Sequence, residues 1–127
     1  MKKPTPVAKI VATGRYLPEN RVTNDDLTEL FDTSDEWIQQ RTGIKERRFA
    51  PDGMGAAEMG EYASRKAIEA AGLEPHDIDM IVFATLSPDW HFPGGGVMLQ
   101  DRLGLNEGKH IKFTPAIDVR NQCSGFL

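Results

Sequence analysis

The chain has 127 residues, of which 39% are hydrophobic, and this length supplies one modest hydrophobic core rather than two. Its net charge of -4 argues against a broad nucleic-acid surface, which needs a basic face, and its single cysteine excludes an intramolecular disulfide framework. No apolar run reaches transmembrane length, and the two N-terminal lysines precede no apolar signal segment. The sequence therefore predicts a cytoplasmic protein that binds neither nucleic acid nor membrane.

Strand and helix signals alternate along the chain, which is typical of an α/β fold. The expected elements, in chain order, are a strand over 7–13, a helix over 24–31 that Asn24 can cap, helices over 33–43 and 56–70, a strand over 80–84, a helix over 97–103, and strands over 111–113 and 116–119. The continuous apolar run at 80–84 favours a central parallel strand that is covered on both faces. No repeat or linker marks a boundary within residues 1–127.

The helix expected over 33–43 carries the first candidate site. Thr33 and Glu36 match a capping box, with Thr33 as the N-cap. Trp37 and Arg41 lie four positions apart and therefore share one face of the helix, where an aromatic plane beside a guanidinium could hold a flat, charged ligand. Arg41 also begins a basic cluster with residues 45, 47 and 48. This cluster could hold a phosphate, although a solvated basic turn is the simpler interpretation.

Two other features have plainer interpretations. The glycines at 94–96 lack the lysine and spacing of a P-loop, so tight helix packing is favoured over a phosphate cradle. His91 lies between two aromatic residues in the loop after an apolar strand, where ligand-facing loops of parallel sheets gather. No carboxylate partner or metal-ligand spacing accompanies His91, so it is interpreted as a loop histidine and no metal site is predicted.

Cys123 lies in a polar turn between a strand-like run that ends at Val119 and a short apolar segment. This pattern is typical of a strand-to-helix elbow that holds a nucleophile, because backbone N–H groups at a helix N-terminus favour a thiolate and lower the pKa of a thiol. A buried structural cysteine is the alternative, and this segment alone does not decide between them. Four further residues cannot close a stable helical turn, so the chain is expected to be part of a larger protein.

Several blocks of sequence together resemble the N-terminal half of β-ketoacyl-acyl-carrier-protein synthase III. They are residues 14–18, 32–38 with 41–44, 91–93 and 123–126. The block that contains Trp37 and Arg41 is the specific one, because other thiolase-fold enzymes have a similar cysteine block. The resemblance runs from about residue 7 to the last residue.

The resemblance implies a thiolase-like layered α/β fold, of which residues 1–127 are an incomplete N-terminal half that ends just after the nucleophile elbow. It implies an acyltransferase that moves an acyl group from acyl-CoA onto Cys123 and condenses it with malonyl-acyl-carrier protein, with loss of carbon dioxide, as in the initiation of fatty acid biosynthesis. Thr33, Trp37 and Arg41 match residues that hold CoA, and Phe92 matches an aromatic that reaches the acyl pocket across a homodimer interface. No cofactor is implied, since acyl-CoA is a substrate.

The family also uses a His and an Asn to stabilise the enolate, and the matching positions lie outside these 127 residues, so this chain alone is expected to be inactive. Residues 120–122 are larger and more polar than the family's usual residues, and 105–115 looks longer than its usual connection. A related polyketide-type synthase or acyltransferase with another acceptor therefore stays open. A non-catalytic α/β interaction module with a structural or redox-sensitive cysteine also stays open, although the matching Thr33, Trp37 and Arg41 argue against it.

Overall fold

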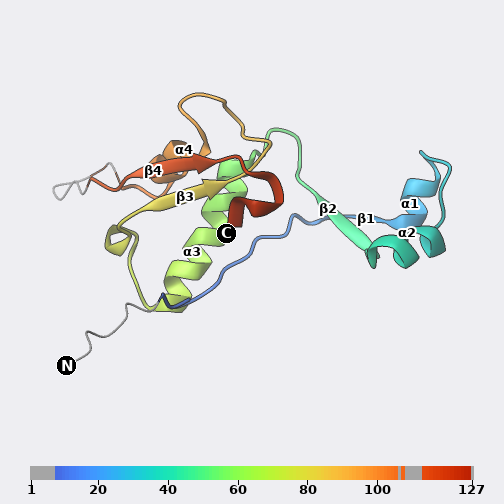
Figure 1. The fold of residues 1–127 in the computed structure, drawn as a ribbon, viewed down its shortest axis with the longest axis horizontal. Helices are drawn as coiled ribbons and strands as arrows, with labels where there is room; N and C mark the ends of the chain where they lie inside the picture. Colours follow the sequence, from blue (N-terminus) through green and yellow to red (C-terminus); the bar gives the residue numbers. More distant parts are fainter. Residues whose placement is uncertain (1–7, 106, 108–112, 127) are drawn as a thin grey trace. The chain divides into compact units, whose positions relative to one another are not determined.

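The computed structural model describes residues 8–105, 107 and 113–126. They form two compact units (Figure 1). Residues 17–55 make up the first, which we call the hairpin unit, and residues 8–16 together with the described residues from 56 onward make up the second, which we call the sheet unit.

The hairpin unit is built on a short antiparallel pair of strands with two helices between them. Its elements are β1 (Asn20–Thr23), α1 (Asn24–Thr28), α2 (Asp35–Thr42) and β2 (Glu46–Phe49). Asn20 lies opposite Phe49 and Thr23 opposite Glu46. These strands were not predicted from the sequence, because each has four residues and is largely polar, without the alternation that marks a half-buried strand.

Helix α1 is capped by Thr23 and not by Asn24. The Thr23 hydroxyl accepts a hydrogen bond from the Asp26 backbone N–H at 3.2 Å, and the Asp26 carboxylate accepts one from the Thr23 N–H at 2.7 Å. This backbone hydrogen bond is the main reason that the pKa of Asp26 lies below its ordinary value. The prediction of a helix over 24–31 was therefore wrong at its cap and too long at its end, since α1 stops at Thr28.

Asn24 instead joins three parts of the hairpin unit. Its residue surface is 1% exposed, and its side-chain amide donates to Asp35 Oδ1 and to the Ile44 backbone oxygen, each at 2.7 Å. Its amide oxygen accepts from Arg47 Nη1 at 2.9 Å. A buried amide with its donors and acceptor satisfied fixes α1, α2 and β2 together.

The N-cap of α2 also differs from the prediction. Ser34 takes this position, and its hydroxyl accepts from the Trp37 backbone N–H at 3.1 Å. The Glu36 carboxylate accepts from the Gln40 side chain at 3.0 Å, so the expected capping box with Thr33 was wrong. The expected end of the helix is confirmed, because Gly43 closes it with φ 70°, a left-handed conformation that favours glycine.

The sheet unit contains a parallel pair of strands with two helices on one face (Figure 1). Its elements are α3 (Ala56–Ala71), the 3-10 helix η1 (Pro75–Asp77), β3 (Ile81–Ala84), α4 (Gly95–Arg102), β4 (Ala116–Val119) and the 3-10 helix η2 (Gln122–Phe126). Ile81 lies opposite Ala116 and Ala84 opposite Val119. The predictions of helices over 56–70 and 97–103 and of strands over 80–84 and 116–119 are confirmed.

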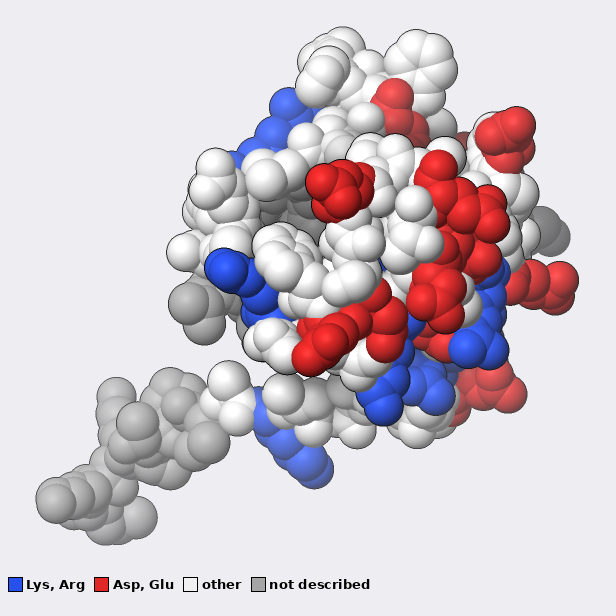
Figure 2. All heavy atoms as spheres, turned by 90° about the vertical axis from the view of Figure 1, so that its right-hand side faces the viewer, with Lys and Arg blue, Asp and Glu red and all other residues white. Residues whose placement is uncertain are grey.

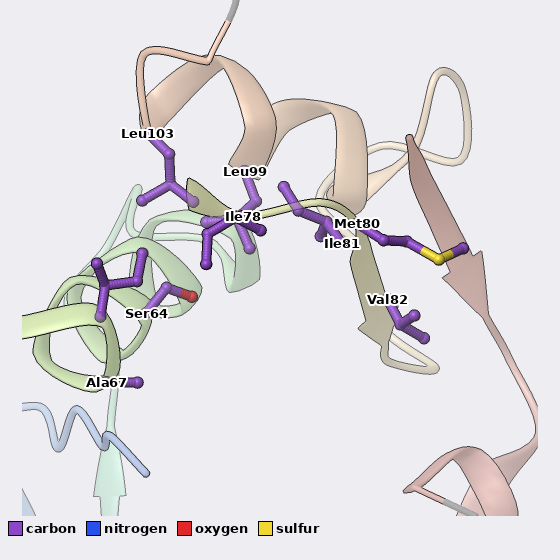
Figure 3. Close-up of a pocket in the computed structure, with 9 residues that line it drawn as sticks. Ser64, Ala67, Ile78, Met80, Ile81, Val82, Leu99 and Leu103 are labelled. Atoms are coloured by element: carbon purple, nitrogen blue, oxygen red, sulfur yellow. The ribbon is translucent and has the colours of Figure 1, made fainter. Parts of the chain in front are cut away.

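Buried aliphatic residues from α3, β3, α4 and the turn after α4 form the core of this unit; they are Ile68, Ile81, Leu99, Leu103 and Leu105. A pocket of about 240 Å³ adjoins this core, and Figure 3 shows Ile78, Leu99 and Leu103 pointing toward one another there. Its lining is apolar except for Ser64 and includes neither Cys123 nor Phe92. This pocket is therefore a packing feature of the core.

The glycines before α4 pack against Phe83 and Asp118. A Cβ on Gly95 would lie 2.4 Å from a Phe83 ring carbon, and one on Gly94 would lie 2.6 Å from an Asp118 carboxylate oxygen. That carboxylate accepts from the backbone N–H groups of Gly95 at 2.8 Å and Gly96 at 2.7 Å. The interpretation as tight helix packing is confirmed, since a carboxylate from β4 occupies the place that a phosphate would take.

Two expectations for the strands do not hold, and a third falls mainly outside the described residues. The outer face of the sheet is open, with Val82 56% exposed, and among the described residues β3 pairs only with β4, so the expectation of a central strand covered on both faces was wrong. Residues 8–13 form no strand and Ile10 is 76% exposed, because an apolar run needs a neighbouring strand to complete its hydrogen bonds. In 111–113, the first two residues lie outside the described residues and Phe113 is not in a strand.

Candidate active site

The candidate site in the sheet unit lies where the two parallel strands end. The Thr85 N–H donates to the Val119 backbone oxygen at 3.2 Å, which extends the pairing of β3 and β4 by one step. Two turns leave the sheet from this edge, residues 85–94 after β3 and 120–121 with η2 after β4 (Figure 1). The carboxyl edge of a parallel sheet is where ligands of α/β proteins commonly bind.

Cys123 lies in the turn after β4. Its thiol is free and its residue is exposed, which contradicts the alternative of a buried structural cysteine. The predicted strand and polar turn are confirmed, and the helix start that follows is the 3-10 turn η2, in which the Ser124 N–H donates to the Asn121 oxygen at 3.0 Å. Gln122 enters this turn with φ 50°, an uncommon conformation for a residue with a side chain.

The turn after β3 presents exposed aromatic residues at the same edge of the sheet. Phe92 is 89% exposed and Trp90 is also exposed. Arg120 reaches this turn, since its Nη1 lies 3.2 Å from His91 Nδ1 and its Nη2 donates to the His91 backbone oxygen at 3.3 Å. The structure thus connects the turn that carries Phe92 to the residue directly after β4.

In the hairpin unit, α2 brings Trp37 and Arg41 together as the spacing predicted. The Arg41 guanidinium carbon lies 5.0 Å from the centre of the Trp37 ring, within the range of a cation–π contact, and Trp37 is 53% exposed. Beside the indole is an open depression of about 470 Å³, lined by Asp32, Thr33, Ser34 and Trp37. The indole therefore borders a space large enough for part of a small ligand, and the Arg41 guanidinium lies against the same ring.

Thr33, which lines this depression, carries an unusual polar atom. Its side-chain oxygen is buried and has no hydrogen-bond partner among the described residues. Buried hydroxyl groups are nearly always paired, so this oxygen is unusual in a residue that lines an open depression. Thr33 was expected to cap α2, but Ser34 takes the N-cap position and the Thr33 hydroxyl makes no capping hydrogen bond.

Part of the basic cluster at 41, 45, 47 and 48 makes hydrogen bonds inside the hairpin unit. Arg47 donates to Asn24, and Arg48 donates to the backbone oxygens of Pro18 and Glu19. Two of the four basic side chains therefore have structural partners. On the face shown in Figure 2, acidic and basic side chains are interspersed and form no continuous basic surface.

Three charged residues with defined contacts were not assigned a role from sequence. Asp118 and Asp89 accept hydrogen bonds from the first backbone N–H groups of α4 and α3, and Arg120 holds the His91 turn. The sequence signal that could have pointed to Asp118 is a charged residue within an otherwise apolar strand. Across the described part of the chain, no group of three or more His, Cys, Asp or Glu residues is placed to hold a metal ion, and no helix is long and apolar enough to cross a membrane.

Comparison with known proteins relates nearly the whole length of the chain to one kind of enzyme. No family model matches the chain. The chain is 47% identical over 120 residues to β-ketoacyl-acyl-carrier-protein synthase III of Neisseria meningitidis and 48% identical over 120 residues to the enzyme of the same name from Methylococcus capsulatus; each match covers 94% of this chain and 36% of the relative. The chain matches the N-terminal part of β-ketoacyl-acyl-carrier-protein synthase III. It spans just over a third of the length of these synthases.

Solved structures agree with the sequence matches. The 3-oxoacyl-acyl-carrier-protein synthase III of Aquifex aeolicus superposes with a TM-score of 0.82 at 43% identity, over 93% of this chain and 36% of that structure. The priming β-ketosynthase of the R1128 polyketide pathway gives a TM-score of 0.81 at 33% identity, over 93% of this chain and 34% of that structure. The expected fold class is confirmed: the chain is an N-terminal portion of a thiolase-like α/β fold.

Proposed function

We propose that the complete protein is an acyl-CoA-primed condensing enzyme and that Cys123 is its nucleophile. The observation that carries this proposal is the exposed thiol of Cys123 at the carboxyl edge of a parallel sheet, in a chain 47% identical to a synthase III. A thiolate is a strong nucleophile and a good acyl acceptor, and it needs access to its substrate. A buried cysteine in a non-catalytic module would lack that access.

The reaction has two transfers. The Cys123 thiolate attacks the thioester carbonyl of acyl-CoA, a bond forms between the cysteine sulfur and the acyl carbon, and CoA leaves as its thiolate. Malonyl-acyl-carrier protein then loses carbon dioxide, and the electron pair of the broken C–C bond forms an enolate. The enolate carbon attacks the acyl-cysteine carbonyl and expels the Cys123 thiolate, which gives 3-oxoacyl-acyl-carrier protein.

Thr33, Trp37 and Arg41 are proposed to hold the nucleotide end of CoA. The exposed indole offers a face on which adenine can stack, and the guanidinium supplies several donors for phosphate oxygens. Thr33 supports the same assignment, because it lines the depression beside the indole. Nucleotide recognition and acyl transfer would then belong to different units of the chain.

Phe92 is proposed to line the acyl pocket of a homodimer. A side chain of this size that is 89% exposed is unusual on a surface that stays open to water, and a second subunit that covers it would remove that exposure. Aromatic and aliphatic side chains are the common lining of pockets for apolar ligands. The acyl group on Cys123 would extend toward Phe92 of the partner subunit.

The likeness to a polyketide priming synthase favours one second candidate, a condensing enzyme that uses another acceptor. Both candidates share the acyl-cysteine step and differ in the second substrate. The complete protein is therefore supplied with a short acyl-CoA and malonyl groups on two carriers, a fatty acid carrier protein and a polyketide carrier protein. We expect carbon dioxide release and a 3-oxoacyl product on the fatty acid carrier. A product only on the polyketide carrier would select the second candidate, and no product on either would contradict both.

A further inference from the structure

Arg120 forms a bridge between the two turns that follow β3 and β4. Its guanidinium meets both the ring nitrogen and the backbone oxygen of His91, at 3.2 Å and 3.3 Å, across 29 positions of sequence. A guanidinium is planar and presents its donors in a fixed fork, so two contacts of this kind define an orientation as well as a distance. Arg120 is therefore able to fix the His91 turn relative to the end of β4.

The two ends of this bridge both adjoin residues of the proposed reaction. His91 directly precedes Phe92, so holding the His91 backbone oxygen limits where the Phe92 side chain can lie. Arg120 directly follows β4, and Cys123 comes three positions later in η2. Because Phe92 is proposed to reach the acyl pocket across the dimer interface, a change at Arg120 would alter the position of Phe92 in the pocket of the partner subunit without removing Phe92 or the thiol.

We propose that Arg120 is a positioning residue that sets the acyl-chain preference of Cys123 of the partner subunit by holding the turn that carries Phe92. This inference rests on the proposed function, because it concerns the same acyl pocket. With the bridge in place, the Phe92 ring has a restricted position and limits the space for the acyl chain. Without it, the turn can move outward and longer chains fit.

The test measures acylation of Cys123 in the complete protein with acetyl-, butyryl- and hexanoyl-CoA, by mass spectrometry of the peptide that carries Cys123. For Arg120→Ala we expect the ratio of acetyl to hexanoyl transfer rates to fall about tenfold, as for the loss of a charge-assisted contact. The acetyl-CoA concentration that gives half the maximal rate should stay unchanged. Because Arg120 is exposed, its loss should leave the unfolding temperature near that of the wild type.

Further variants separate positioning from charge. Arg120→Lys keeps the charge but lacks the planar fork, so it should behave like Arg120→Ala. His91→Ala removes one of the two contacts and should shift the ratio in the same direction but less, with no further shift when it is combined with Arg120→Ala. The matched control is Arg102→Ala, which removes surface ion pairs to Glu58 and Glu61 on α3 and should leave the ratio unchanged.

Either of two results would overturn this inference and leave the proposed function intact. The first is an unchanged chain-length ratio in Arg120→Ala while Cys123 is still acylated, and the second is a wild-type ratio in Arg120→Lys. The second result would mean that only the charge matters. Absence of any acyl adduct on Cys123 in the wild-type protein would overturn the proposed function and this inference together. The two failures are therefore distinguishable in one set of measurements.

Discussion

The hairpin unit and the sheet unit are stabilised in different ways. Apart from Pro18, Ile38 is the only buried apolar residue described in the hairpin unit, whose parts are joined by the buried Asn24 amide and by ion pairs such as Arg21 to Glu46 at 2.5 Å. The sheet unit has a continuous aliphatic core and glycines packed directly against an aromatic ring. Exposed residues of the hairpin unit can therefore change ligand affinity with little effect on folding, whereas changes near the sheet act first on stability.

The largest expected effect tests whether the two units together are sufficient for the reaction. Residues 1–127 by themselves should release no carbon dioxide from malonyl-acyl-carrier protein, because the enolate-stabilising His and Asn implied by the family lie outside them. The open sheet face around Val82 should also make the isolated chain associate. Condensation by this purified chain, free of any second chain, would show that catalysis needs nothing beyond the two units.

Trp37→Ala tests the hairpin unit as a nucleotide-binding region. Stacking of a base on an aromatic ring contributes roughly 1–3 kcal/mol, so CoA affinity measured by calorimetry on the complete protein should fall by about one to two powers of ten. The unfolding temperature should change little, since the indole is half exposed. Acylation of Cys123 by a small thioester without a nucleotide should proceed as in the wild type. Unchanged CoA affinity would place the nucleotide elsewhere.

Gly95→Ala tests the sheet unit as a packing-limited region. Because the new Cβ would lie 2.4 Å from the Phe83 ring, we expect a loss of about 1–3 kcal/mol in the free energy of unfolding, measured by denaturant titration. Gly60→Ala is the matched control: it faces the same ring at 3.1 Å, and it gains helix propensity inside α3. Equal stability of the two variants would mean that the contact at Gly95 relaxes without cost.

Arg41→Ala is expected to give the smallest effect. It removes the cation beside Trp37 and should weaken CoA binding several-fold at low ionic strength. The difference in affinity from the wild type should shrink in about 0.5–1 M salt, where the screening length is only a few ångströms. The measurement is CoA titration across a salt series. A difference that is independent of salt would indicate a packing role for the Arg41 stem and no contact with phosphate.

Contacts within one helix could be predicted from the sequence, whereas contacts that depend on how separate elements pair could not. Trp37 and Arg41 are brought together by the period of one helix, so their spacing was sufficient. The contact of Arg120 with His91 depends on how β3 and β4 pair, and no local pattern contains that information. The cap of α2 was predicted one residue early, because Thr33 and Ser34 are both good N-caps and only the backbone decides which one accepts from the helix.

The fold itself was predicted best where elements are long or strongly apolar. Helix α3 and strands β3 and β4 were confirmed, since hydrophobic periodicity and glycine stops mark them clearly. Strands β1 and β2 were missed because their polar sequences pair through backbone hydrogen bonds that carry no side-chain signature. The caps formed by Asp89 and Asp118 were missed because each carboxylate is distant in sequence from the helix it caps.

The central claim is that Cys123 accepts the acyl group, and one measurement tests it most directly. The complete protein is incubated with acetyl-CoA, and the peptide that contains Cys123 is weighed by mass spectrometry for the wild type and for Cys123→Ser. We predict one added acetyl group on the wild-type peptide and none on the variant. An acetyl group that remains on the protein in equal amount in Cys123→Ser would show that another residue is the nucleophile and would contradict the proposal.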